Sequence, residues 1–288
     1  MKRILTLCIV LCTMMSSFAQ TDTTGKQIPA AEGDTIRIGG MIIIRKAGSK
    51  NRDVVNDTTY KMHHWRGDKP ANLSTNWLIF DFGFSNYKEN TNYLSVAAQQ
   101  YAPGSNGTWF DLRDGKSQNV NIWLFMQKLN MIKHVVNLKY GLGVELNNYR
   151  YKQPIRYQAN TAAIPNPPRV ILDGTVSRAY EKNKLAADYV TIPMMLNFNF
   201  TPNRHEGFGF SAGISAGYLY NARNKTITSD EGKRKAKDDF ELEKWKLSYI
   251  AELSLGPVRL YGSYAFNSMY ERGLDMTPYN FGIRFSKW

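Results

Sequence analysis

The chain has little cysteine, and both of its cysteines lie near the N-terminus. Among 288 residues only Cys8 and Cys12 carry a thiol, which excludes a disulfide framework or a cysteine-ligated metal farther along the chain. After residue 20 the sequence also lacks any apolar run approaching the roughly 20 residues that a membrane helix needs. A disulfide-rich secreted domain and a helical membrane protein are therefore both excluded.

The first 19 residues have the pattern of an export signal. Lys2 and Arg3 form a charged start, residues 4–15 are apolar, and residues 17–19 form a small-residue cleavage site. The apolar run is about 12 residues long, too short for a membrane anchor. We therefore expect cleavage before Gln20 and a mature chain without cysteine.

The most informative pattern is an alternation of apolar and polar residues with a period of two. It is cleanest over residues 134–147, where one face would carry Val136, Leu138, Tyr140, Leu142, Val144 and Leu146. Successive side chains of a strand point to opposite faces, so this segment has one apolar face and one polar face. The segment is therefore predicted to be a strand with an apolar environment on one side and an aqueous one on the other.

Eight stretches with this pattern predict eight strands, joined alternately by short and long links. The strands are residues 76–85, 118–129, 134–147, 188–200, 207–220, 244–256, 258–267 and 278–286. The short links are residues 130–133, 201–206 and 256–257, and the long links are residues 86–117, 150–187, 221–243 and 268–277. This arrangement is typical of a transmembrane barrel. We expect an all-β fold: an eight-stranded antiparallel up-and-down transmembrane β-barrel with short periplasmic turns and long extracellular loops. A secreted β-sandwich or lectin-like domain is the alternative.

The alternation also assigns individual side chains to the lumen or to lipid. It places Trp77 in the lumen and Met126 on the lipid face. Pro193 falls on the lumen side of its strand, where we expect a β-bulge to accommodate the missing backbone donor. The interior of an eight-stranded barrel is just wide enough for side chains to fill, so we expect a largely plugged lumen.

The expected domain organisation has three parts. Residues 1–19 are the signal peptide, residues 20–75 a periplasmic N-terminal segment, and residues 76–288 the barrel. Within the N-terminal segment, residues 36–45 predict a short strand or a hairpin that turns at two glycines. With short turns on the periplasmic side, both termini are periplasmic and the protein resides in the outer membrane of a Gram-negative cell.

Four segments carry a resemblance to a known family. They are residues 34–44, residues 141–149, residues 189–193 and the glycine-alternating residues 207–220. Together they resemble the outer-membrane β-barrel family of Bacteroidota that includes PorT-like proteins. The resemblance implies a barrel but no active site, because these motifs are architectural.

The four histidines are the first candidates for catalysis, because histidine commonly serves as a general base. His63 and His64 fall in the N-terminal segment, and His134 and His205 fall at short turns. All four would then be periplasmic, away from the outer part of the wall where barrel enzymes place their catalytic groups. A metal site shared by these histidines is the alternative to solvated turn residues. We expect no catalytic residue, no metal and no cofactor.

A second constellation consists of charges that the alternation turns toward the lumen. They are Asp81, Lys139, Glu145, Lys246, Glu252 and Arg284. Paired carboxylates can perform acid–base chemistry, but a narrow interior more often needs charges of mixed sign that satisfy one another. We expect a structural network. Because barrel closure brings the last strand beside the first, Asp81 should pair with Arg284.

The long links carry much of the net charge of +13, which becomes +11 without the signal peptide. The second long link contains Arg150, Lys152, Arg156, Arg169, Arg178, Lys182 and Lys184 against Asp173 and Glu181. We expect Arg150, Lys152, Arg156 and Arg178 to contact phosphates of outer-membrane lipid, including lipopolysaccharide. The basic run at residues 233–237 is nearly balanced by nearby acidic residues and predicts a solvated loop.

These observations predict a small non-enzymatic outer-membrane barrel with a role in envelope structure, surface interaction or secretion assistance. Its partners would be lipid and other envelope or secretion proteins, and nucleic acid is excluded for an exported barrel. A barrel enzyme acting on outer-membrane lipid or peptide, and a narrow channel, are the alternatives.

Overall fold

The chain divides into two compact units, residues 1–64 and residues 65–288. The computed structural model describes residues 35–38, 41–44, 71–113, 115–159, 167–174, 179–202 and 207–286. In the first unit, β1 (Thr35–Ile38) and β2 (Met41–Ile44) form an antiparallel hairpin. This corresponds to the hairpin alternative for residues 36–45.

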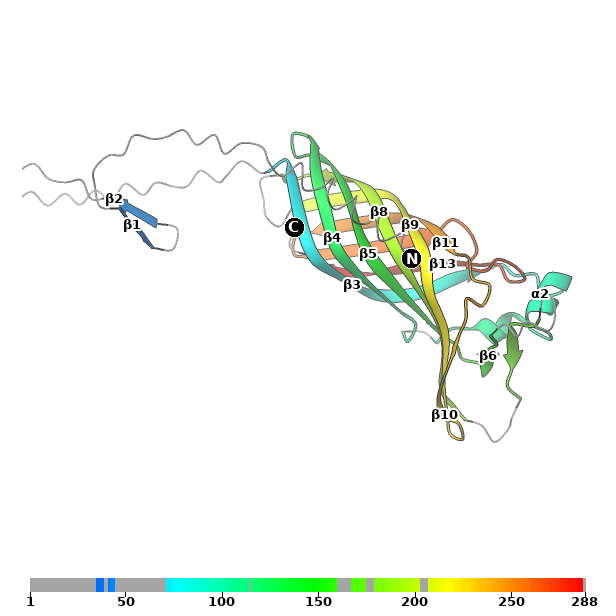
Figure 1. Cartoon of the computed structure of the whole chain (residues 1–288). Helices are drawn as coiled ribbons and strands as arrows, with labels where there is room; N and C mark the ends of the chain where they lie inside the picture. The colour runs from blue at the N-terminus through cyan, green and yellow to red at the C-terminus, as the bar shows by residue number, and fades with distance from the viewer. Residues whose placement is uncertain are drawn as a thin grey trace, which may run out of the picture. The chain divides into compact units, whose positions relative to one another are not determined.

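The second unit contains a closed ring of eight antiparallel strands (Figure 1). They are β3 (Leu73–Glu89), β4 (Gln118–Ile132), β5 (Val136–Arg150), β8 (Tyr180–Asn199), β9 (Phe208–Thr228), β11 (Trp245–Leu255), β12 (Val258–Ala265) and β13 (Met276–Phe285). Each strand pairs with the next, and β13 pairs with β3 to close the ring. The predicted eight-stranded antiparallel barrel is confirmed.

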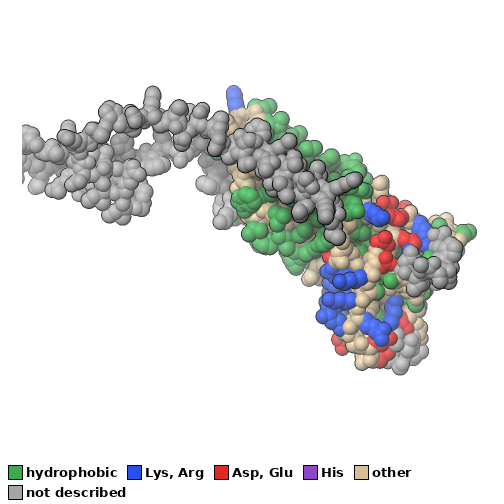
Figure 2. Space-filling model, viewed as in Figure 1, with side chains coloured by type: hydrophobic (Ala, Val, Ile, Leu, Met, Phe, Trp, Pro, Cys, Tyr) green, Lys and Arg blue, Asp and Glu red, His purple; other side chains and the backbone are tan. Residues whose placement is uncertain are grey.

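The outer wall of the ring is covered by large apolar side chains. Figure 2 shows hydrophobic side chains over the barrel and charged side chains gathered at one end. Phe82 on β3 is 48% exposed, and Ile192 on β8 is 57% exposed. A continuous apolar surface of this kind is unfavourable in water and is expected where a barrel faces lipid.

One irregularity reverses the sides expected for two residues. Leu124 is an extra residue in β4 relative to β5, and Leu78 on the facing strand β3 has a φ of 53°. Beyond this point the alternation changes phase, so Met126 is fully buried and Trp77 is 68% exposed. The predictions of an inward Trp77 and an outward Met126 are therefore wrong. They assumed that the alternation continues unchanged through residue 124, whereas the bulge there shifts it by one residue.

Strand β8 passes Pro193 without a bulge. Its register with β5 does not shift between Met194 and Thr191, although the two residues between them are unpaired on that side. On the other side Pro193 is the register partner of Ser215 in β9. Proline has no backbone N–H, and here it lies where the hydrogen-bond ladder between β8 and β5 is interrupted. The predicted bulge is therefore wrong.

Much of the sequence predicted as long loops is folded. Residues 180–187 and 221–228 continue β8 and β9 beyond the barrel, and β10 (Gly232–Lys237) pairs with the end of β9. The run at residues 233–237 is therefore an exposed strand and not a loop. The other long links contain α2 (Val96–Tyr101), the 3-10 helix η1 (Gly107–Phe110), β6 (Ile155–Tyr157) and β7 (Val170–Leu172). In the described part of the chain, no helix is both long and apolar enough to cross a bilayer.

Candidate functional site: the closed lumen and the loop cap

A cluster of ion pairs crosses the lumen, centred on Arg284. Because β13 pairs with β3, Arg284 and Asp81 are register partners. The guanidinium donates from Nε to Asp81 Oδ1 over 2.7 Å, from Nη2 to Asp81 Oδ2 over 2.8 Å, and from Nη1 to Glu252 Oε2 over 2.6 Å. Lys139 Nζ donates to the other oxygen of Glu252 over 2.7 Å. All four side chains are buried, so each charge is balanced inside the barrel.

A second group surrounds Glu145. Lys246 forms an ion pair with its carboxylate. The amides of Asn147 and Asn280 each donate to Glu145 Oε1 over 3.0 Å. The structure thus divides the six predicted lumen charges into two groups, one of four residues and one of two.

The contacts of Asp81 show how fully its carboxylate is used. Besides Arg284, the indole Nε1 of Trp123 and the amide of Asn121 donate to Oδ2 over 2.8 and 3.1 Å. Both carboxylate oxygens therefore accept hydrogen bonds from N–H groups of β13 and β4. Such a group holds neighbouring strands together and is poorly suited to take a proton from a substrate.

An apolar layer also lies inside the barrel. It consists of Ile79, Trp123, Met126 and Met195, with Ile250 packed against them. A cavity beside this layer, lined in part by Trp123, Met195 and Ile250, has a volume of about 30 Å³, enough for about two waters. The alternation missed this layer because the bulge at Leu124 turns Met126 inward.

The loop end of the lumen is covered by a second core, here called the loop cap. Inward side chains at the ends of the barrel strands pack with residues of the long links. The core contains Tyr101, Phe110, Tyr149, Tyr151, Ile155, Tyr157, Leu185, Tyr189, Leu219, Phe240, Leu242, Tyr270 and Met276, among others. The long links therefore close the barrel mouth with a hydrophobic core of their own.

Three tyrosines form a chain of hydroxyl contacts inside the loop cap. The hydroxyls of Tyr151 and Tyr157 lie 2.7 Å apart, and those of Tyr157 and Tyr270 lie 2.6 Å apart. Burial raises the pKa of each phenol well above its usual value near 10. The phenols are therefore neutral, and each hydroxyl can both donate and accept.

The predicted lipid contacts are dispersed by the fold. Arg156 Nε lies 3.0 Å from Asp173 and its Nη2 lies 2.8 Å from Glu231, so this guanidinium ties parts of the cap together. Arg150 donates from Nη2 to a backbone carbonyl over 2.8 Å, and Lys152 is exposed. Arg178 lies outside the described residues.

The histidines are not brought into one described site. His134 lies in the turn between β4 and β5 with a φ of 59°, and its backbone N–H donates to Asn130 Oδ1 over 2.7 Å. His63, His64 and His205 lie outside the described residues. Within the described ranges, no group of three or more His, Cys, Asp or Glu residues could hold a metal ion.

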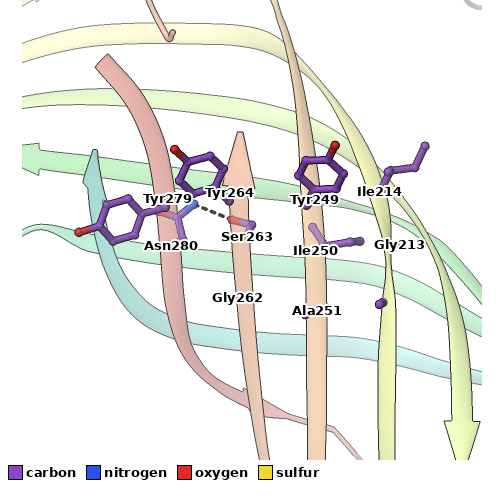
Figure 3. A pocket seen from close by; sticks show the side chains of 11 residues that line it. Gly213, Ile214, Tyr249, Ile250, Ala251, Gly262, Ser263, Tyr264, Tyr279 and Asn280 are labelled. Carbon is purple, nitrogen blue, oxygen red and sulfur yellow. Dashed lines mark hydrogen bonds between the residues drawn. The ribbon is translucent and has the colours of Figure 1, made fainter. Parts of the chain in front are cut away.

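The outer wall has a hollow of about 920 Å³ across β9, β11, β12 and β13 (Figure 3). Its centre is a cross-strand row of small residues, Ala212, Ala251 and Gly262. The next row toward the cap contains the tyrosines Tyr249, Tyr264 and Tyr279. This hollow opens on the apolar wall.

A closed ring of strands with an apolar outer wall, a charged interior and folded links at one end defines a transmembrane β-barrel of the outer-membrane type. Residues 75–275 match the sequence model of the family described as outer membrane protein beta-barrel domain, and the chain belongs to this family. No curated protein matches the chain.

Proposed function

We propose that this outer-membrane barrel is a non-enzymatic, non-conducting protein whose loop cap is a surface for interactions at the cell envelope. The observation that carries the proposal is the closure of the lumen, both in its interior and at its loop end. The ion pairs around Arg284 and the apolar layer around Met126 fill the interior of the barrel side by side, and the core of the loop cap covers its end. A path for substrates or solutes would have to break each of them.

The enzyme alternative is less well supported by the lumen chemistry. Glu252 is shared by Lys139 and Arg284, and Glu145 is held by a lysine and two amides. Carboxylates in such contacts resemble structural ion-pair networks more than a general acid–base pair, which needs access to a substrate proton. The charges are therefore assigned a structural role in this proposal.

We also propose how the barrel is oriented in the outer membrane. Long links face outward and short turns face the periplasm in bacterial barrels of this kind, which makes both termini periplasmic and turns the loop cap to the outside. We also propose that the chain is related to the PorT-like proteins of Bacteroidota. If it is, assistance to secretion is the alternative to a role in surface interaction.

Conductance in planar lipid bilayers tests the closed lumen. The purified barrel should insert without giving stable current steps. A Trp123→Ala/Met126→Ala variant, which removes two large side chains of the apolar layer, should show measurable steps if it keeps the gel mobility of a folded barrel. Steps of similar size from the unmodified protein would contradict closure and favour the narrow channel.

A further inference from the structure

A row of cations crosses the sheet where it extends beyond the barrel. Arg150 of β5, Lys184 of β8, Lys225 of β9 and Lys235 of β10 are consecutive register partners. Like charges directly opposite each other on neighbouring strands destabilise a sheet. The stability of the fold therefore does not explain this row, whereas a bound anion would.

More cations lie on the same face, which we call the cation face. Its members are Arg150, Lys182, Lys184, Arg223, Lys225, Lys233, Lys235 and Lys237. Figure 2 shows Lys and Arg side chains gathered over the part of the molecule that carries β10. Such a concentration of one sign creates a positive potential that attracts anions.

Little on this face neutralises the row itself. Asp188 accepts from Arg223 over 2.6 Å, and Lys184 donates to the amide oxygen of Asn148. Among the described residues, Lys184, Lys225 and Lys235 have no carboxylate partner. Partial burial and the neighbouring cations Lys182, Arg223 and Lys225 lower the pKa of Lys184 to about 8, as expected for a site of positive potential.

The cation face continues the lipid-facing wall of the barrel. In β8 the even-numbered residues from Val190 to Phe198 are exposed on the lipid-facing side. Lys184 is also even-numbered and lies on the same side of the strand. In β9 an extra residue between Leu219 and Asn221 shifts the alternation, which turns Lys225 outward. The opposite face of this extension packs on the loop cap. A ligand on the cation face would therefore sit beside the barrel wall, above the lipids that surround it.

The height of the row favours a large head group. Arg150 lies four positions beyond Leu146, the last outward apolar side chain of β5, about 13 Å along the strand at roughly 3.3 Å per residue. With a strand tilt of about 40°, this places the row about 10 Å above the apolar belt. A phospholipid head group extends only about 5–8 Å beyond the hydrocarbon. Phosphates carried on a sugar head group reach farther.

We propose that the cation face binds phosphate groups on the sugar head of an outer-leaflet glycolipid held beside the barrel wall. The proposal rests on the outward orientation of the loop cap given under the proposed function. It replaces the four contacts expected from the sequence, Arg150, Lys152, Arg156 and Arg178, with the eight cations of this sheet surface. Arg150 belongs to both sets, whereas Arg156 is occupied by two carboxylates of the cap.

Titration of fluorescent lipopolysaccharide against the full-length protein in neutral detergent micelles tests this proposal. The variant Lys184→Gln/Lys225→Gln/Lys235→Gln removes three charges of the row. Exposed charge contacts contribute modestly each, so we expect binding about tenfold weaker at low salt and a smaller difference at high salt. The matched control is Lys88→Gln/Lys116→Gln/Lys152→Gln, three exposed lysines outside the face, with less than about a twofold loss.

Two further binding measurements distinguish phosphate on a glycolipid from free phosphate. Dephosphorylated lipopolysaccharide should bind the unmodified protein as weakly as intact lipopolysaccharide binds the row variant. Inorganic polyphosphate should compete only at concentrations well above those of the lipid. Equal losses in the two lysine variants, undiminished binding of the dephosphorylated lipid, or tighter binding of polyphosphate would each overturn the proposal. Gel mobility before heating verifies that each variant is folded. Micelles expose both ends of the barrel, so a wrong orientation would not affect these results.

Discussion

At the residue scale, Arg284 is the side chain on which most of the lumen depends. It donates two hydrogen bonds to Asp81 and shares the carboxylate of Glu252 with Lys139. These contacts join β13 to β3 and β11, so one guanidinium links three strands across the interior. Removing it leaves two buried carboxylates short of a positive charge.

Arg284→Met should therefore lower the free energy of unfolding by about 3–5 kcal/mol. Lys139→Met should cost clearly less, because Glu252 keeps Arg284. Arg284→Lys should fall between the two, since it keeps the charge and loses the bidentate geometry. Urea unfolding followed by tryptophan fluorescence in lipid vesicles measures all three. Equal costs for Arg284→Met and Lys139→Met would contradict the central role of Arg284.

Some residue contacts could be predicted from the sequence and others could not. The proximity of Asp81 and Arg284 follows from ring closure, which needs only the strand count and the inward phase of each residue. The contact of Met126 with the apolar layer depends on one inserted residue, Leu124. Because Leu124 is itself apolar, nothing in the local pattern distinguishes a bulge from a continuous strand.

At the element scale, the phase of the alternation marks where the barrel leaves the lipid. In β8 the outward residues Val190 and Ile192 are apolar, and the inward Thr191 is polar. Beyond the lipid the pattern inverts: the inward Leu185 is in the cap core, and the outward Lys184 is charged. The strand prediction ended near residue 188 because it required an apolar outward face. A search for inverted alternation would have extended the strand.

The loop cap should open at alkaline pH. Burial raises the pKa of Tyr151, Tyr157 and Tyr270 above the value near 10 of an unfolded chain. For groups shifted in this direction, the stabilisation is complete below about pH 10. It declines as the pH rises above that value, because the unfolded phenols lose protons first. Trypsin cleavage within residues 182–237 should therefore increase above about pH 10, together with the tyrosinate absorbance.

Tyr157→Phe provides the comparison for this alkaline transition. It removes one titrating group and both hydroxyl contacts of the tyrosine chain. The cap should be cleaved somewhat faster at neutral pH, with a smaller relative increase at alkaline pH. Cleavage of the unmodified protein that stays constant well above pH 10 would show that these phenols do not control cap stability.

At the scale of the whole molecule, the two ends of the barrel differ in size and chemistry. One end carries the short turns and the C-terminal strand end. The other carries the loop cap and the extension of β8 and β9 (Figure 1), and the cation face lies on that extension. A surface that binds glycolipid is useful only if the capped end faces outward. The orientation therefore decides whether the proposed lipid contacts can form in a cell.

Cysteine labelling in intact cells measures this orientation directly. Both cysteines of the sequence lie in the predicted signal peptide, so the unmodified mature protein should give no signal. Ser229→Cys introduces a thiol at the exposed tip between β9 and β10, and Pro257→Cys introduces one in the exposed turn between β11 and β12. A membrane-impermeant maleimide should label Ser229→Cys in intact cells and Pro257→Cys only after the outer membrane is permeabilised. The reverse result would place the capped end in the periplasm, where an outer-leaflet glycolipid could not reach the cation face even if it binds there in micelles.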